Sequence, residues 1–127
     1  MSKRKGSVAE RQLQKLFWEN GWPTMRAAGS GSTSFPCPDL ICGRNGRRLC
    51  IEVKITKDQK KYFSEQEIRE LRYFAHMFGA EAWVAVKFPR EEWLFFALED
   101  LRETGKNFVI ALTEKEQKGL LLSELID

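Results

Sequence analysis

Two strand-like runs separated by Asn45-Gly46 constrain the fold of this 127-residue chain more than any other feature. The runs cover residues 39–44 and 47–55 and are rich in apolar residues. An Asn-Gly pair between two such runs is the strongest short-range indication of a β-hairpin with a two-residue turn. The centre of the chain is therefore predicted to be an antiparallel strand pair.

The register of this hairpin decides which side chains meet at its open end. With two residues in the turn, Arg44 pairs with Arg47, and Asp39 then faces Glu52. Lys54 lies on the same face as Glu52, because side chains alternate along a strand. A three-residue turn would instead set Asp39 opposite an apolar residue. Two facing carboxylates repel, so either a hard divalent cation such as Mg²⁺ or an ion pair with Lys54 must offset them, and the spacing leaves both open.

Two helices are predicted from capping boxes followed by apolar residues at helical spacing. Ser7-x-x-Glu10 opens a helix over residues 8–20, and Ser64-x-x-Glu67 opens a second helix that ends at Phe78-Gly79. In the first box Glu10 has a purely structural interpretation, as the residue that caps the Ser7 backbone N–H.

Strands account for most of the remaining apolar runs. They are predicted over residues 22–28, 82–88 and 93–98, with a possible last strand at 108–112 and a short helix capped from Thr113. We expect Ile51 and Val53 on one face of the sheet and Ile41 and Cys50 on the other. The order of elements predicts an α/β fold, with a central mixed β-sheet flanked by helices.

Length and composition favour a single domain over residues 1–127. Within it, residues 1–6 are predicted to form a basic flexible arm and residues 29–38 a mobile loop rich in Ser and Gly. No run of about 20 apolar residues could span a membrane, and no apolar stretch follows the basic start as in a signal peptide. The three cysteines lack metal-site spacing and are interpreted as reduced thiols of a cytoplasmic protein.

The charge is unevenly distributed along the chain. Residues 1–62 hold 13 Lys and Arg against 5 Asp and Glu, whereas residues 63–127 hold 8 against 13. A basic half on a nearly balanced chain indicates a surface that binds a polyanion such as nucleic acid. The charges of Lys5, Arg44, Arg47 and Arg48 are individually typical of a solvated surface and together could follow a DNA backbone.

Pro38-Asp39 followed by Glu52-Val53-Lys54 forms the P-D…E-x-K pattern of the restriction-endonuclease-like nucleases. Several longer segments, in the same order and at similar spacing, extend the likeness over about residues 4–98. With these segments the chain resembles the archaeal Holliday junction resolvases. The segments are Lys5-Gly6-Ser7, Ala9-Glu10-Arg11, Arg26 to Ser32, Pro38 to Ile41, Ile51 to Lys54, Gln66, Phe74-Ala75, Phe78-Gly79-Ala80 and Ala85 to Phe88 before Trp93.

The resemblance implies a restriction-endonuclease-like fold and a homodimer that cuts two opposing strands of four-way junction DNA in recombination and repair. It implies Mg²⁺ as cofactor, replaceable by Mn²⁺, and no small organic cofactor. The implied metal ligands are Glu10, Asp39 and Glu52 with the Val53 carbonyl; Lys54 and Ser30 would act at the scissile phosphate, and Arg11 and Arg26 would contact phosphates. Two alternatives stay open, another nuclease of the same fold and a basic nucleic-acid-binding module without hydrolytic activity.

The second predicted helix has more apolar surface than one packed face requires. Its core stripe is predicted to be Ile68, Leu71, Ala75 and Phe78, with Tyr73, Phe74 and Met77 outside it. The extra surface is expected to be buried in the homodimer. The alternative is that the apolar tail at residues 120–126 folds back over it.

Overall fold

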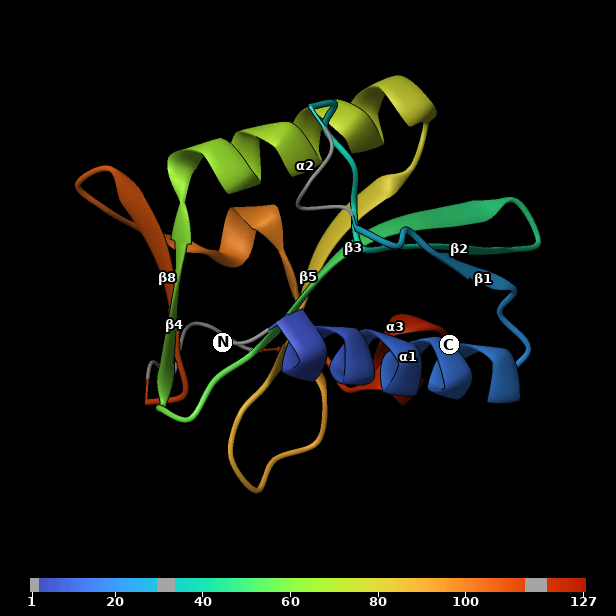
Figure 1. Cartoon of the computed structure of the whole chain (residues 1–127), viewed down its shortest axis with the longest axis horizontal. Coiled ribbons are helices and arrows are strands. Elements are labelled where there is room, and N and C mark those ends of the chain that lie inside the picture. The colour runs from blue at the N-terminus through green and yellow to red at the C-terminus, as the bar shows by residue number, and fades with distance from the viewer. Residues whose placement is uncertain (1–2, 30–33, 114–118) are drawn as a thin grey trace.

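The computed structural model describes residues 3–29, 34–113 and 119–127. It consists of two sheets with three α-helices (Figure 1). The elements in chain order are α1 (Lys3–Glu19), β1 (Thr24–Arg26), β2 (Leu40–Arg44), β3 (Arg47–Ile55), β4 (Lys60–Ser64), α2 (Glu65–Phe78), β5 (Glu81–Lys87), β6 (Leu94–Ala97), the 3₁₀-helix η2 (Leu98–Asp100), β7 (Arg102–Thr104), β8 (Asn107–Ala111) and α3 (Leu122–Leu125).

A five-stranded mixed sheet in the order β1-β2-β3-β5-β6 forms the centre of the molecule. Strands β3 and β5 pair in parallel and the other neighbours are antiparallel. Figure 1 shows α1 and α3 on one side of this sheet and α2 on the other. The predicted α/β class and the flanked mixed sheet are confirmed.

Strand β3 contributes to both apolar layers of the core. Ile51 and Val53 lie in the cluster that packs against α1, whereas Cys50 lies with Ile41 in the cluster under α2. This alternation is the predicted one, and it follows from a strand whose two faces are both covered by helices. Beyond Cys50, the α2 face of β3 continues with Glu52 and Lys54, so the charged end of β3 directly follows its buried part.

The first helix begins earlier than its capping box predicts. Residues 3–6, expected to be a separate flexible arm, form the first turn of α1, and Ser7 lies inside the helix instead of at its N-cap. The predicted box at Ser7 and Glu10 is therefore wrong. Ser64 and Glu67, in contrast, form the predicted capping box of α2, and Gly79 ends that helix with a φ of 79°.

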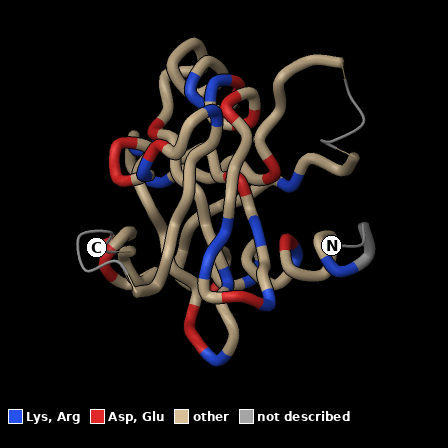
Figure 2. The backbone as a smooth tube through the Cα atoms, turned by 90° about the vertical axis from the view of Figure 1, so that its left-hand side faces the viewer, with Lys and Arg blue, Asp and Glu red and all other residues tan. Residues whose placement is uncertain are grey.

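A second sheet, in the order β4-β8-β7, was only partly predicted. Residues 57–61 are polar and basic in sequence, without the apolar alternation of a strand, yet β4 begins at Lys60 and pairs with β8. This pairing joins segments more than 40 residues apart, so no local pattern indicates it. Figure 2 faces this sheet and shows basic and acidic residues interspersed along the backbone rather than separated into two regions.

The C-terminal segment packs on the α1 side of the large sheet. Leu120 bridges to Phe95, and Leu125 is 2 % exposed in the α1 cluster. The tail therefore does not cover α2, where Tyr73, Met77 and Phe78 remain about half to two-thirds exposed. The predicted stripe of α2 is wrong at Phe78, because Phe74 instead packs against the core beneath α2.

Two further observations concern the cysteines and the apolarity of the helices. Cys37, Cys42 and Cys50 are free thiols. In the described parts of the chain, none of the helices has the length and apolarity needed to cross a membrane. The short helix expected from Thr113 falls largely on residues 114–118, outside the described residues.

The placement of the tail predicts an unequal response at two nearby leucines. Leu125→Ala is expected to lower the free energy of unfolding by about 2–4 kcal/mol, because it leaves a cavity between α3 and the sheet. Leu121→Ala, at a residue 38 % exposed, is expected to cost less than about 1 kcal/mol. Urea denaturation measures both, and equal effects at the two positions would contradict a docked tail.

Candidate active site

The hairpin brings Asp39 and Glu52 together as predicted. Arg44 pairs with Arg47, and the ladder ends at the pair formed by residues 40 and 51, one position before Asp39 and Glu52. Asp39 is 7 % exposed, and its Oδ2 accepts a hydrogen bond from the Val53 backbone N–H at 2.8 Å. The register of a three-residue turn is thereby excluded.

The pairing is costly for the ionised form of Glu52. Burial raises the pKa of Glu52 well above its ordinary value, and the hydrogen bond to Asp39 and the repulsion by Asp39 raise it further. The nearby Lys54 acts in the opposite direction. A second carboxylate beside a largely buried first one is an arrangement that favours a bound cation.

Lys54 lies between two glutamates. Its Nζ is 3.8 Å from Glu52 Oε2 and 2.7 Å from Glu67 Oε1. Burial alone would lower the pKa of Lys54, but these two carboxylates outweigh it and the pKa is raised. Glu67 was not among the predicted site residues. The sequence pattern marked it only as the third helical residue of a capping box, and the fold places that helix end beside Lys54.

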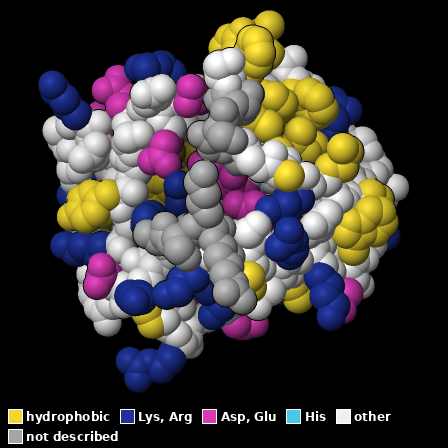
Figure 3. All heavy atoms as spheres, in the orientation of Figure 1, with side chains coloured by type: hydrophobic (Ala, Val, Ile, Leu, Met, Phe, Trp, Pro, Cys, Tyr) yellow, Lys and Arg dark blue, Asp and Glu magenta, His cyan; other side chains and the backbone are white. Residues whose placement is uncertain are grey.

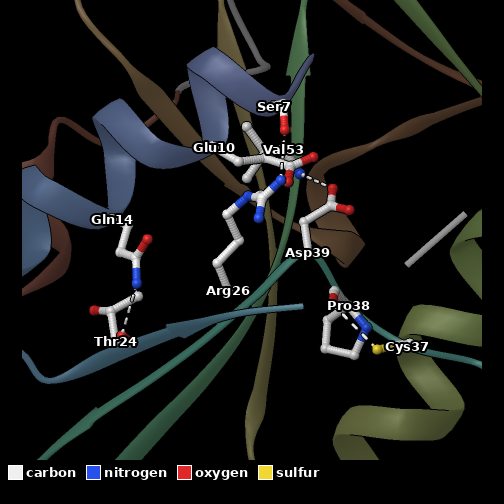
Figure 4. A network of polar contacts seen from close by, with 9 residues as sticks. All are labelled: Ser7, Glu10, Gln14, Thr24, Arg26, Cys37, Pro38, Asp39 and Val53. Atoms are coloured by element: carbon white, nitrogen blue, oxygen red, sulfur yellow. Dashed lines mark hydrogen bonds and ion pairs between the residues drawn. The ribbon is translucent and has the colours of Figure 1, made fainter. Parts of the chain in front are cut away.

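Glu10 reaches the same place from α1. Arg26 donates from Nε to Glu10 Oε1 at 3.0 Å and from Nη2 to Ser7 Oγ. Figure 4 shows this trio beside the contact between Asp39 and Val53. Burial and the repulsion by Asp39 raise the pKa of Glu10, while Arg26 lowers it. Ser7 and Glu10, three residues apart on one helix face, thus hold an arginine instead of capping the helix.

Several of the predicted DNA-binding arginines have partners within the fold. Arg47 forms two hydrogen bonds to Glu81, at 2.8 and 3.0 Å, donates to the Leu125 carbonyl and lies over the Trp22 ring. Arg44 donates to the Asn20 carbonyl and Arg48 to the Gly79 carbonyl.

The two ends of the hairpin are far apart. Residues 44–47 lie at the turn, five residues along β2 from Asp39, or about 17 Å at the rise of a strand. The structure therefore gathers Glu10, Arg26, Asp39, Glu52 and Lys54, and it leaves Arg44, Arg47 and Arg48 at the other end of the hairpin. Lys5 and Arg11 are exposed on α1, close in sequence to Glu10. Ser30 lies outside the described residues.

The donor set suits a hard cation but is small. Within the part of the chain that the structure describes, no three His, Cys, Asp or Glu side chains group closely enough to hold a metal ion. Asp39 and Glu52 supply two neighbouring carboxylates, and the Val53 carbonyl is the predicted third oxygen ligand. Mg²⁺ is typically bound by one or two carboxylates and keeps several waters, so these residues fit such an ion.

The chain is similar to known proteins in sequence and in fold. The sequence profile of the archaeal Holliday junction resolvase (Hjc) family matches residues 1–127. A crossover junction endodeoxyribonuclease Hjc of Archaeoglobus fulgidus is 46 % identical over 85 % of this chain and 79 % of its own length. The corresponding protein of Methanocaldococcus jannaschii is 38 % identical over 84 % of this chain and 76 % of its own.

Solved structures agree with the sequence matches. The structure of Archaeoglobus fulgidus Hjc, a Holliday junction resolvase, superposes with a TM-score of 0.86 at 41 % identity, covering 95 % of this chain and 94 % of that one. A bacterial homing endonuclease superposes with a TM-score of 0.54 at 18 % identity, covering 94 % of this chain and 82 % of that one, and shares the fold alone. The predicted restriction-endonuclease-like fold is confirmed.

The raised pKa of Glu52 predicts how stability depends on pH. A carboxyl whose pKa is higher in the folded state stabilises the fold fully below its unfolded pKa, and this contribution is lost as the pH rises through the folded pKa. Glu52→Gln stays neutral and escapes that loss. The metal-free variant should therefore match the unsubstituted protein at pH 4 and be more stable at pH 7.

Urea denaturation at the two pH values measures this difference. Glu99→Gln, the same change at an exposed residue, serves as the control and should show no such dependence. A stability difference for Glu52→Gln that does not change with pH would contradict the burial and repulsion described above.

Proposed function

Because the chain belongs to the archaeal Holliday junction resolvase family, we propose that it is an endodeoxyribonuclease that cuts four-way DNA junctions at the Asp39–Glu52–Lys54 site. The observation that carries the proposal is the meeting of these three side chains at the open end of the hairpin, in a chain that matches the family along its whole length. The chemistry is hydrolysis of a phosphodiester, and the cell compartment is the cytoplasm, on DNA.

Metal dependence is part of the proposal. Asp39 and Glu52 would hold a Mg²⁺ ion, for which Mn²⁺ would substitute, and the Val53 carbonyl would be a further oxygen ligand. When bound, this ion polarises a phosphoryl oxygen and lowers the pKa of a water. The repulsion between the two carboxylates supports the assignment, because a divalent cation removes it.

The side chains around the proposed metal site orient water and bind the phosphate. The Lys54 ammonium orients the attacking water and stabilises the negative charge that develops on the phosphoryl oxygens. Glu10 adds negative charge beside Asp39. It would contact the metal ion through a water, because Arg26 engages one of its oxygens. Arg26, fixed in this way, faces the phosphate from the α1 side of the site. Ser30 remains a proposed contact of the scissile phosphate.

Recognition rests on junction shape and phosphates, which requires no base-specific contact. Lys5 and Arg11 are exposed on α1, close in sequence to Glu10, and add positive charge that would contact phosphates. More distant phosphates would be contacted from the turn of the hairpin, by Arg44, Arg47 and Arg48. Of these, Arg47 already binds Glu81.

A homodimer supplies the two sites that two symmetric cuts require. The outward face of α2 supports it as an interface. Tyr73, Met77 and Phe78 are 59, 68 and 48 % exposed, and the Phe78 ring stacks on Phe74 with centroids 5.5 Å apart. Figure 3 shows hydrophobic side chains gathered over the C-terminal half of this helix. The C-terminal tail, the other candidate cover, lies on the opposite side of the sheet.

Neutralising either carboxylate tests the catalytic centre. Asp39→Asn and Glu52→Gln should each lower single-turnover cleavage of an immobile four-way junction in Mg²⁺ by about 1,000-fold or more. Junction binding in Ca²⁺ should be retained or tightened, because less negative charge faces the phosphates. Denaturing gels measure cleavage and gel shifts measure binding.

Glu99→Gln is the matched control and should cleave normally. Near-normal cleavage by either site variant would contradict the assignment. Equal cleavage of a linear duplex of the same sequence would favour another nuclease of this fold, and binding without cleavage by the unsubstituted protein would favour a non-hydrolytic module.

The dimer is tested separately. Met77→Glu together with Phe78→Glu should convert a dimer into a 14.8 kDa monomer in sedimentation equilibrium at micromolar concentration. Charges at both positions would be buried without partners in the proposed interface. Val8→Glu, at a 45 % exposed residue of α1 across the sheet, should remain dimeric. A dimer that survives the double substitution would rule out α2 as the interface.

A further inference from the structure

Lys54 is held more closely by a residue outside the metal-ligand set than by Glu52. Its Nζ lies 2.7 Å from Glu67 Oε1 but 3.8 Å from Glu52 Oε2. The first distance is that of a charge-assisted hydrogen bond, whereas the second is a looser ion pair. Glu67 therefore determines where the ammonium group stands in this structure.

The position of Glu67 is itself fixed by the start of α2. Its other oxygen, Oε2, accepts a hydrogen bond from the Ser64 backbone N–H at 2.9 Å, and the Glu67 N–H donates to Ser64 Oγ at 3.1 Å. Both oxygens of the carboxylate are thus engaged, one by the helix cap and one by Lys54. A glutamate held at two points is a rigid anchor for a flexible partner.

The backbone under this cap is also anchored. Ser64 is the last residue of β4 and pairs with Asn107 of β8, so the N-terminus of α2 begins at the edge of the three-stranded sheet. A continuous series of contacts joins that sheet, through the cap, to Lys54 on β3. Electrostatics agrees with the geometry, because burial works against ionisation of Glu67 but Lys54 and the Ser64 groups lower its pKa.

A lysine requires such an anchor if its ammonium group is to act at one place. Its flexible four-carbon stem has many rotamers, and the Lys54 side chain is 21 % exposed. Glu52 cannot serve as the sole anchor, because its carboxyl group also contacts Asp39 and would bind the cation.

We propose that Glu67 is a positioning residue of the nuclease site, which holds the Lys54 ammonium group toward the scissile phosphate from the capping box of α2. The inference rests on the proposed function for its catalytic consequence. The contact between Glu67 and Lys54 is independent of that function. The experiment therefore has one readout for each.

Glu67→Gln is the informative change. Glutamine also completes a capping box, so the helix start is preserved while the charge facing Lys54 is lost. Single-turnover cleavage of a four-way junction in Mg²⁺ is expected to fall about 10- to 100-fold, the scale of a small misplacement of a reacting group. Junction affinity in Ca²⁺ and the melting temperature should remain close to those of the unsubstituted protein.

Two control variants separate positioning from helix stability. Glu65→Gln removes the same charge from the same helical turn, where Glu65 forms an exposed pair with Arg69, and should leave the cleavage rate unchanged. Ser64→Ala removes the hydroxyl that accepts from the Glu67 N–H but keeps the backbone N–H that holds Glu67 Oε2. It should therefore lower the melting temperature while leaving the rate within about twofold. A rate that follows the melting temperature across these variants would overturn the positioning role.

The second readout requires no catalysis. In the metal-free protein, reductive methylation followed by mass spectrometry compares the labelling of Lys54 with that of exposed Lys60. Lys54 should be labelled more slowly than Lys60, and Glu67→Gln should raise its labelling several-fold. Unchanged labelling would overturn the contact.

The two readouts also distinguish the failure of this inference from the failure of the proposed function. Unchanged or faster cleavage by Glu67→Gln, with an active unsubstituted protein, would overturn the positioning role alone. An unsubstituted protein that does not cut junctions, but whose Lys54 labelling depends on Glu67, would overturn the proposed function and with it the catalytic consequence of the contact.

Discussion

The register of the β2–β3 hairpin is the constraint on which the rest of the site depends. Asn45 and Gly46 both adopt positive φ angles, 50° and 85°, which is the geometry of a two-residue turn that matches the twist of its strands. With this turn, Asp39 stands beside Glu52 and the Val53 N–H. A slip of one residue would turn Glu52 and Lys54 toward the apolar layer under α1.

The cost of facing carboxylates is distributed over the surrounding structure. The polar groups around the pair form a series in which each carboxylate has a cation or an N–H donor near it. This series runs through Arg26, Glu10, Asp39, Glu52, Lys54 and Glu67, and its members come from β1, α1, the start of β2, β3 and α2. The helices on both faces of the sheet thus contribute charge to the site as well as apolar cover.

Ion pairs between the two halves of the sequence explain why its charge asymmetry does not become a basic half of the molecule. Arg47 from the basic half binds Glu81 from the acidic half, and Lys54 binds Glu67 in the same way. Figure 2 accordingly shows mixed charges. The excess of Lys and Arg in the sequence therefore overstates the surface available to DNA, and among the described residues the exposed Lys5 and Arg11 of α1 lie close in sequence to Glu10.

The sequence by itself determined the hairpin, its register, the capping box of α2 and the meeting of Asp39, Glu52 and Lys54, because each depends on residues close together or on the strict alternation of a strand. Only the tertiary structure decided the pairing of β4 with β8, the docking of the tail beneath the sheet, the partners of Arg47 and the role of Ser7. It also brought Glu67 to Lys54. These contacts join segments between 13 and 78 residues apart along the chain, and such contacts depend on how whole elements pack, which no local pattern encodes.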